Sequence, residues 1–213
     1  MAFNDMIKEF GVVTVMNAKI YEYDDTICEP STGVPTAKDV RDGYALHSTS
    51  SSTGKLLAEI DSLKVANITV EGPNKTVTGG RYSNPLIKFG KTARLEMQDA
   101  LGRANAIAAF GGCVNEEVSS NITAMHITED FSPVRTVIGE TFFIDRTTGA
   151  QEWVDIVFYQ VLPDSIFNLT QDAEGDATVF DMNADLLTTE ISVNGTKKGV
   201  FYSILSHASA STN

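Results

Sequence analysis

Carboxylates are the residues in this sequence best suited to chemistry, and their densest group is the turn Asp172-Ala173-Glu174-Gly175-Asp176. A calcium loop of the EF-hand type needs glycine at its sixth position and glutamate at its twelfth. Here glycine stands at the fourth position, and the twelfth is Asn183. The spacing therefore favours an ordinary solvated turn over a calcium site.

Two further carboxylates, Asp181 and Asp185, lie in the sharpest alternation of the chain, from Thr178 to Leu187. A glycosidase needs two acids about 5–10 Å apart. Four residues along one strand separate these two by roughly 13 Å, so they do not form such a pair by themselves. An enzyme of this kind would need a second carboxylate from a facing strand.

Other catalytic signatures are absent from the sequence. The histidines His47, His126 and His207 fall in different segments, and none belongs to a His-Glu-x-x-His motif. The chain has no Gly-x-Ser-x-Gly elbow and no glycine-rich phosphate loop before a helix. We therefore predict no enzyme activity, no metal and no cofactor.

The formal net charge is −12, from 16 basic and 28 acidic residues. A protein that grips nucleic acid needs lysine and arginine to displace counterions from phosphates, so the charge argues against that class. It does not argue against a surface that DNA passes without sticking. Solubility alone is the other reading of the acidity.

Cys28 and Cys113 have no neighbours at metal-ligand spacing, which indicates two free thiols in a reducing cytoplasm. No apolar run approaches the roughly 18 residues of a membrane span, so we expect no membrane partner.

The elements that must position these groups are mostly strands. Residues 92–98 alternate polar and apolar side chains, as a half-buried strand does. Asp99 then begins an alanine-rich stretch that predicts a helix over about 99–110, with Gly111 and Gly112 as its left-handed stop. This helix should cover one end of the strand assembly or its outer wall.

The segment 28–55 shows no clear period and holds several prolines, glycines and the run Ser48–Thr53. So long a stretch without periodicity is unusual inside a compact domain. We predict a long mobile arm that is too polar to fold on its own and that orders on assembly, with a short strand within 34–46 as an alternative.

Turn signals separate the remaining strands. The sequence Arg146-Thr147-Thr148-Gly149 predicts a hairpin between 136–145 and 151–162, and Asn194-Gly195 predicts a type I′ turn in a terminal hairpin of about 190–205. We expect one mainly β domain over 1–213, a sandwich or barrel of about seven to nine antiparallel strands with one flanking α-helix. Residues 206–213 should fray.

Two stretches resemble the major tail tube proteins of long-tailed bacteriophages, both siphovirus-like and myovirus-like. They are GGRYSNPLIKFGKTARLEMQDALGRANAIAAFGG, from Gly79 to Gly112, and EGDATVFDMNADLL, from Glu174 to Leu187. Together they cover about a quarter of the chain. The resemblance implies a structural virion protein that closes into homohexameric rings, which stack into a conduit for double-stranded DNA during ejection.

On this view we expect Asp181, Asp185 and, less strongly, Glu96 to face the lumen. The alternative is that they lie on the solvated outer face of the sheet, which also needs polar residues. Arg94 shares the strand face of Glu96 and would offset it. The arm would join successive rings, and its candidate contact residues are Pro35, Asp39, Arg41, Asp42 and Tyr44.

The partners implied are further copies of this chain, a tape-measure protein, and tail terminator and baseplate proteins. The protein would assemble in the bacterial host cytoplasm and reside in the virion tail. Two other classes stay open: a β-rich baseplate or receptor-binding adhesion module, and an enzyme with two carboxylates on a β-scaffold.

Overall fold

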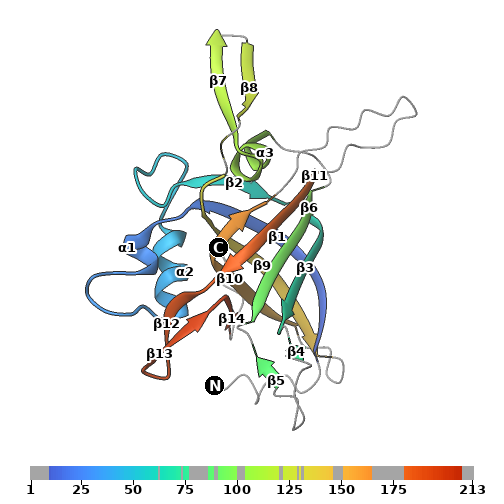
Figure 1. The fold of residues 1–213 in the computed structure, drawn as a ribbon. Helices are drawn as coiled ribbons and strands as arrows, with labels where there is room; N and C mark the ends of the chain where they lie inside the picture. The colour runs from blue at the N-terminus through green and yellow to red at the C-terminus, as the bar shows by residue number, and fades with distance from the viewer. Residues whose placement is uncertain are drawn as a thin grey trace.

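The chain folds around one large antiparallel sheet, shown by the computed structural model in Figure 1. The structure describes residues 10–61, 63–72, 74–76, 86–88, 91–99, 104–119, 122–128, 130, 132–145, 151–164 and 180–207. Within these residues the sheet consists of β1 (Phe10–Glu22), β2 (Leu56–Ile60), β3 (Leu63–Glu71), β6 (Thr92–Asp99), β9 (Arg135–Asp145), β10 (Gln151–Pro163), β11 (Phe180–Leu187) and β14 (Tyr202–His207).

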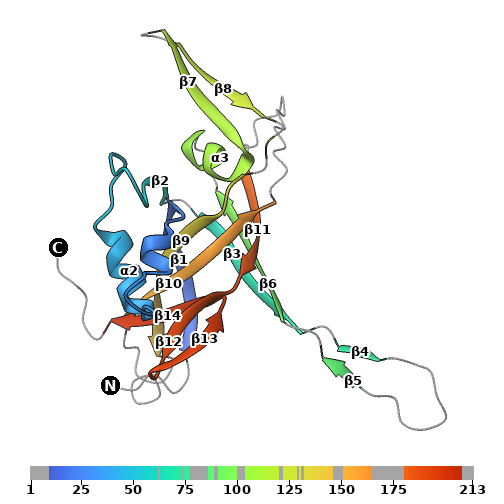
Figure 2. The same cartoon turned by 60° about the vertical axis from the view of Figure 1, so that its left-hand side comes forward.

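The strands run in the order β2-β1-β9-β10-β11-β6-β3, and β14 also pairs with β10. The sheet curls so that β3, at one end of this order, comes against β1 near the other end (Figures 1 and 2). One edge of β10 is shared by two strands, because β14 pairs with residues 153–158 and β11 with residues 160–163. The opposite edge of β10 pairs with β9.

Smaller elements surround the sheet. Three two-stranded ribbons are formed by β4 (Asn74–Thr76) with β5 (Leu86–Lys88), β7 (Cys113–Ser119) with β8 (Ile122–Ile127), and β12 (Thr189–Val193) with β13 (Thr196–Val200). The helices of the described residues are α1 (Asp25–Cys28), α2 (Ala37–Ala45) and α3 (Ala104–Gly111). Figures 1 and 2 both show the β7–β8 ribbon projecting from the body beside α3.

Side-chain alternation on β6 and β11 sorts apolar and polar residues as the sequence predicts. The inward side chains are buried in the main core: Ala93, Leu95, Met97, Met182, Ala184 and Leu186. The predictions of a mainly β, antiparallel fold and of a strand over 92–98 are confirmed, and so is the part of the alternating segment 178–187 that is described, residues 180–187.

The predicted helix exists, but its start differs. Asp99 is the last residue of β6, whereas α3 begins at Ala104, so Asp99 is not its N-cap. The end agrees to within one residue, since Gly111 is the last residue of α3 and Gly112 follows it with a φ of 66°. A Cβ at Gly112 would lie 2.7 Å from the carbonyl oxygen of Asp130, so only glycine fits there. Helix α3 lies at one end of the curled sheet, with Ile107 and Phe110 in the main core (Figure 1).

The prediction that residues 28–55 lack regular structure is wrong, as is the alternative of a short strand within 34–46. Helix α2 starts with a capping box in which Thr36 and Asp39 bind each other's backbone N–H groups. Val40 and Tyr44, one helical turn apart, are fully buried in a second apolar cluster on the outer side of the sheet. The sequence shows no clear helical period here because only a narrow stripe of the helix is apolar.

The two predicted hairpins are formed, with one revision. Strands β9 and β10 pair antiparallel, and β10 ends at Pro163. Asn194 and Gly195 have φ of 52° and 74°, as a type I′ turn requires between β12 and β13. The stretch after the turn is two strands, because β13 stops at Val200 and β14 crosses to β10.

Some predictions fall outside the described residues or at their border. The acidic turn 172–176 and residues 208–213 lie outside them. Ser206 and His207 belong to β14 and pair with Val154 and Trp153, so the fraying predicted to start at 206 does not include them.

The phenol of Tyr44 connects α2 to the sheet. Its oxygen accepts a hydrogen bond from the backbone N–H of Asp24 (2.8 Å) and lies 3.0 Å from Oγ1 of Thr136 on β9. Its ring contacts that of Tyr21 on β1, with centroids 5.1 Å apart. Burial raises the pKa of Tyr44 far above its usual range, so the phenol stays protonated.

Replacing Tyr44 by Phe should lower the free energy of unfolding by about 1–3 kcal/mol, because it leaves the buried N–H of Asp24 without its acceptor. Urea denaturation followed by far-UV circular dichroism measures the change. Tyr23→Phe is the control, since the Tyr23 hydroxyl bonds only to the side chains of Glu29 (3.3 Å) and Gln160 (3.0 Å) among the described residues, and these two side chains also bond to each other. Loss of the Tyr23 hydroxyl leaves no buried backbone group without a partner and should cost less than about 1 kcal/mol. Equal losses in the two variants would show that α2 is not anchored through Tyr44.

Candidate functional site

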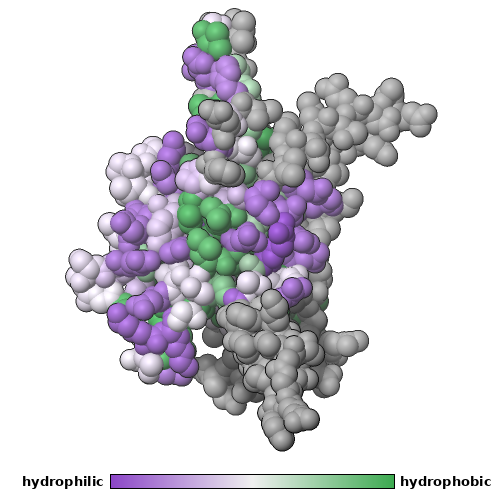
Figure 3. Space-filling view, viewed as in Figure 1, coloured by the Kyte–Doolittle hydropathy of each residue, from purple (hydrophilic) through white to green (hydrophobic). Residues whose placement is uncertain are grey.

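The outward side chains of three neighbouring strands form one continuous polar surface, which we call the acidic face. Strand register places Glu96 between Asn183 and Asn67, and Arg94 between Asp185 and Thr69. The complete set is Asn67, Thr69, Glu71, Thr92, Arg94, Glu96, Gln98, Asp164, Asp181, Asn183 and Asp185. Figure 3 shows hydrophilic side chains gathered over β6 and β11.

The acidic face holds five carboxylates and one guanidinium, a formal charge of −4. Arg94, the only cation among these eleven described residues, lies close to three of those carboxylates. Its Nη2 is 2.8 Å from Asp164 Oδ2, its Nη1 is 3.6 Å from Asp185 Oδ1, and its Nε is 3.7 Å from Glu96 Oε1. The guanidinium is therefore already committed to carboxylates of the same face, and the charge that remains is negative.

Residue Asp164 was not identified from the sequence, although it completes this arrangement. It follows β10, and its backbone N–H donates to the carbonyl of Asn183 on β11 (2.9 Å). This bond holds Asp164 where its carboxylate can pair with Arg94. Glu71 was also missed, since its place opposite Thr92 becomes visible only once β3 is known to pair with β6.

The three residues proposed for the lumen do share one side of the sheet. Asp181, Asp185 and Glu96 are all exposed, and Asp181 accepts a hydrogen bond from Nε2 of its register partner Gln98 (2.8 Å). Arg94 does offset Glu96, as expected, but it offsets Asp164 and Asp185 as well. That this side of the sheet faces a lumen stays a prediction.

The residues proposed for the assembly arm are engaged within their own chain. Pro35 accepts a hydrogen bond from the backbone of Ser192 on β12 (2.9 Å), Asp39 closes the capping box of α2, and Tyr44 is buried. Hydrogen bonds from Thr36 hold the pKa of the Asp39 carboxyl below its usual value. A role of this segment in joining rings stays a prediction.

Arg41 anchors the middle of α2 to the sheet. Its Nε donates to Oδ2 of the buried Asp155 on β10 (2.7 Å), and its Nη1 donates to Asp42 (3.0 Å). Partial burial lowers the pKa of Arg41, but the hydrogen bonds to Asp42 and Asp155 raise it overall. Asp42 also pairs with Lys38 one turn earlier on the exposed side of α2.

The described residues hold no cluster of three or more histidine, cysteine or acidic side chains that could bind a metal. Cys28 and Cys113 are free, as the sequence predicts, and both are buried. Burial raises the pKa of Cys28 to about 11. His126 lies 3.0 Å from Glu116 on the β7–β8 ribbon, and Nδ1 of His47 lies 2.7 Å from the carbonyl of Thr53.

Comparison with known proteins leaves the family of the chain open. By sequence, the chain matches no protein-family model and no curated protein. Within the described residues, none of the helices is both long enough and apolar enough to cross a bilayer.

Replacing Arg41 by Gln should lower the free energy of unfolding at pH 7 by about 3–5 kcal/mol, because it removes the cation paired with a buried carboxylate. Urea denaturation measures this loss. The control is Lys38→Gln, which breaks the exposed pair with Asp42 and should change stability by less than about 1 kcal/mol. Similar losses for the two variants would contradict the anchoring role of Arg41.

Proposed function

We propose that this protein is a structural subunit of a phage tail tube, in which six copies form a ring and rings stack into a conduit for double-stranded DNA. The observation that carries the proposal is the acidic face, an exposed surface of three strands whose single cation lies among three carboxylates. The resemblance of residues 79–112 and 174–187 to tail tube proteins gives the architecture.

Electrostatics explains why such a surface suits a DNA conduit. Double-stranded DNA carries a negative charge about every 1.7 Å along its axis, and proteins bind it by displacing counterions with lysine and arginine. A wall that offers no free cation gives the phosphates no point of attachment. Six copies of a chain with net charge −12 would carry −72 per ring. Salt screens charges beyond about 8–10 Å, but less effectively where they face one another across a narrow lumen.

Unpaired strand edges give a second, independent support for self-assembly. In the described part of the chain, β2, β3 and β14 each pair with one strand of the sheet only. Exposed edges invite pairing with another chain unless something covers them. Closing a ring of identical copies removes edges, and a head-to-tail contact between rings propagates into a tube.

Electron microscopy of the purified protein at increasing concentration tests the proposal. We expect stacked rings or tubes with six-fold symmetry, in which the acidic face lines the inside. Monomers that persist at millimolar concentration would overturn it. Monomers that also bind a soluble receptor or glycan would instead point to a baseplate or adhesion module.

Reversing charge on the acidic face tests its role separately from assembly. The double variant Asp181→Lys with Asp185→Lys should still assemble, because both side chains are exposed, but it should slow genome exit and retain DNA at low salt. Single-particle ejection kinetics and a DNA co-sedimentation assay measure these effects.

The matched control is Asp25→Lys with Glu190→Lys, which makes the same charge change at exposed positions outside the acidic face. It should leave both readouts as in the unaltered protein. Unchanged ejection and no DNA retention in the first variant would remove Asp181 and Asp185 from the lumen, even if tubes form.

A further inference from the structure

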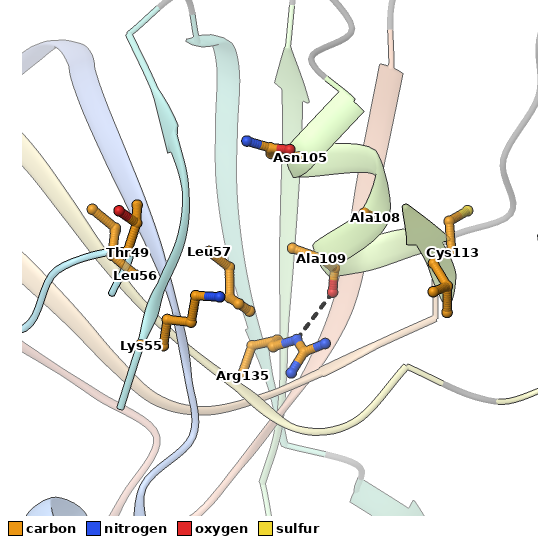
Figure 4. Close-up of a pocket in the computed structure, with 10 residues that line it drawn as sticks. Thr49, Lys55, Leu56, Leu57, Asn105, Ala108, Ala109, Cys113 and Arg135 are labelled. Carbon is orange, nitrogen blue, oxygen red and sulfur yellow. Dashed lines mark hydrogen bonds between the residues drawn. The ribbon is translucent and has the colours of Figure 1, made fainter. Parts of the chain in front are cut away.

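A hollow of about 430 Å³ lies where β2, α3 and the beginning of β9 meet, on a different part of the molecule from the acidic face. Figure 4 shows Lys55 and Arg135 at its lower side, Asn105 above them on α3, and Leu57 and Ala109 between. Its lining combines two cationic side chains with neutral polar groups and short aliphatic walls. We call it the Lys55–Arg135 pocket.

The charge of this pocket is opposite to that of the chain. Among the described residues its lining contains Lys55 and Arg135 and no aspartate or glutamate, although acidic residues outnumber basic ones by 28 to 16 in the sequence. Lys55 and Arg135 repel each other, and Glu22, the register partner of Arg135 on β1, is not part of the described lining. An anion between the two cations would relieve their repulsion.

Arg135 is held in a fixed orientation that leaves donors free. Its Nε donates to the carbonyl of Ala109, near the end of α3, at 3.1 Å. The described residues give its guanidinium no ion pair, and burial lowers its pKa, with Glu22 opposing that shift. The two terminal nitrogens keep a planar pair of N–H groups, which is the geometry that matches a carboxylate.

The remaining lining defines which anion fits. The ammonium of Lys55 supplies a second charge, while Asn105 and Thr49 add neutral hydrogen-bonding groups. Leu57 and Ala108 contribute apolar wall, which favours a hydrocarbon stem over a fully hydrated ion. We propose that the Lys55–Arg135 pocket binds a small organic carboxylate with a short aliphatic stem.

A purely structural role for Arg135 makes a different prediction. A cation at the C-terminal end of a helix stabilises the last carbonyls, and the contact with Ala109 fits that role. This role involves Arg135 alone, so it gives Lys55 no function. Binding that depends on Lys55 therefore separates the two interpretations.

Isothermal titration calorimetry of the full chain with butyrate and with inorganic phosphate, at constant ionic strength, tests the proposal. We expect one site per chain that binds butyrate more tightly than phosphate. Lys55→Gln should weaken butyrate binding about tenfold, since it removes one charge-assisted contact. Lys198→Gln, the same change at an exposed lysine of β13 outside the pocket, should leave the affinity unchanged.

Arg135→Gln should abolish binding, and circular dichroism checks that α3 persists in this variant. Lys55→Glu provides a second test that spares the Arg135–Ala109 contact, because it puts a carboxylate at the pocket and should also abolish binding. No heat of binding for butyrate, equal affinities for butyrate and phosphate, or equal losses in Lys55→Gln and Lys198→Gln would each overturn the proposal.

Discussion

The strict two-sidedness of β6 and β11 is the constraint on which the rest of the structure depends. Side chains alternate across a strand, so burial of Leu95 and Met182 on one side forces their sequence neighbours to the other. Those neighbours are Arg94, Glu96, Asp181 and Asn183. The apolar core and the acidic face are therefore two consequences of one register, and a slip by one residue would exchange them.

The outer side of the sheet is divided between two uses. Over β1, β9 and the middle of β10 it is covered by α2 and the β12–β13 ribbon, which enclose the second apolar cluster. Over β3, β6 and β11 it is exposed and acidic. Tyr44 and Arg41 fix the border by joining α2 to Thr136 and Asp155. The same surface of one sheet thus supports packing in one half and solvent or partner contact in the other.

Local patterns predicted much of this fold. The alternation at 92–98 and 180–187, the Asn194-Gly195 turn and the glycine stop after α3 all act within a few residues, so the sequence exposes them directly. Helix α2 was missed because its stability comes from Tyr44 contacts with residues about 20 and 92 positions away. Contacts between residues so far apart leave no periodic pattern in the local sequence.

The candidate site was likewise predictable only where its residues lie on alternating strands. Asp181, Asp185 and Glu96 were found because each lies on an alternating strand, whereas Asp164 follows a strand end and reaches Arg94 only through the β10–β11 pairing. The Lys55–Arg135 pocket gave no signal in the sequence, since its two cations are 80 positions apart and meet only when β2 and β9 are both folded against α3.

The shared edge of β10 has a mechanical consequence. Its residues 153–158 are held by β14, and only the four pairs from Gln160 to Pro163 tie it to β11. Tension applied at the C-terminal strand would thus peel β14 from β10 and leave this four-pair seam as the direct connection between β10 and the strand that carries Asp181 and Asp185. Within the described residues, strand pairing therefore joins the acidic strands to β10 through these four residue pairs alone, whether or not β14 is in place.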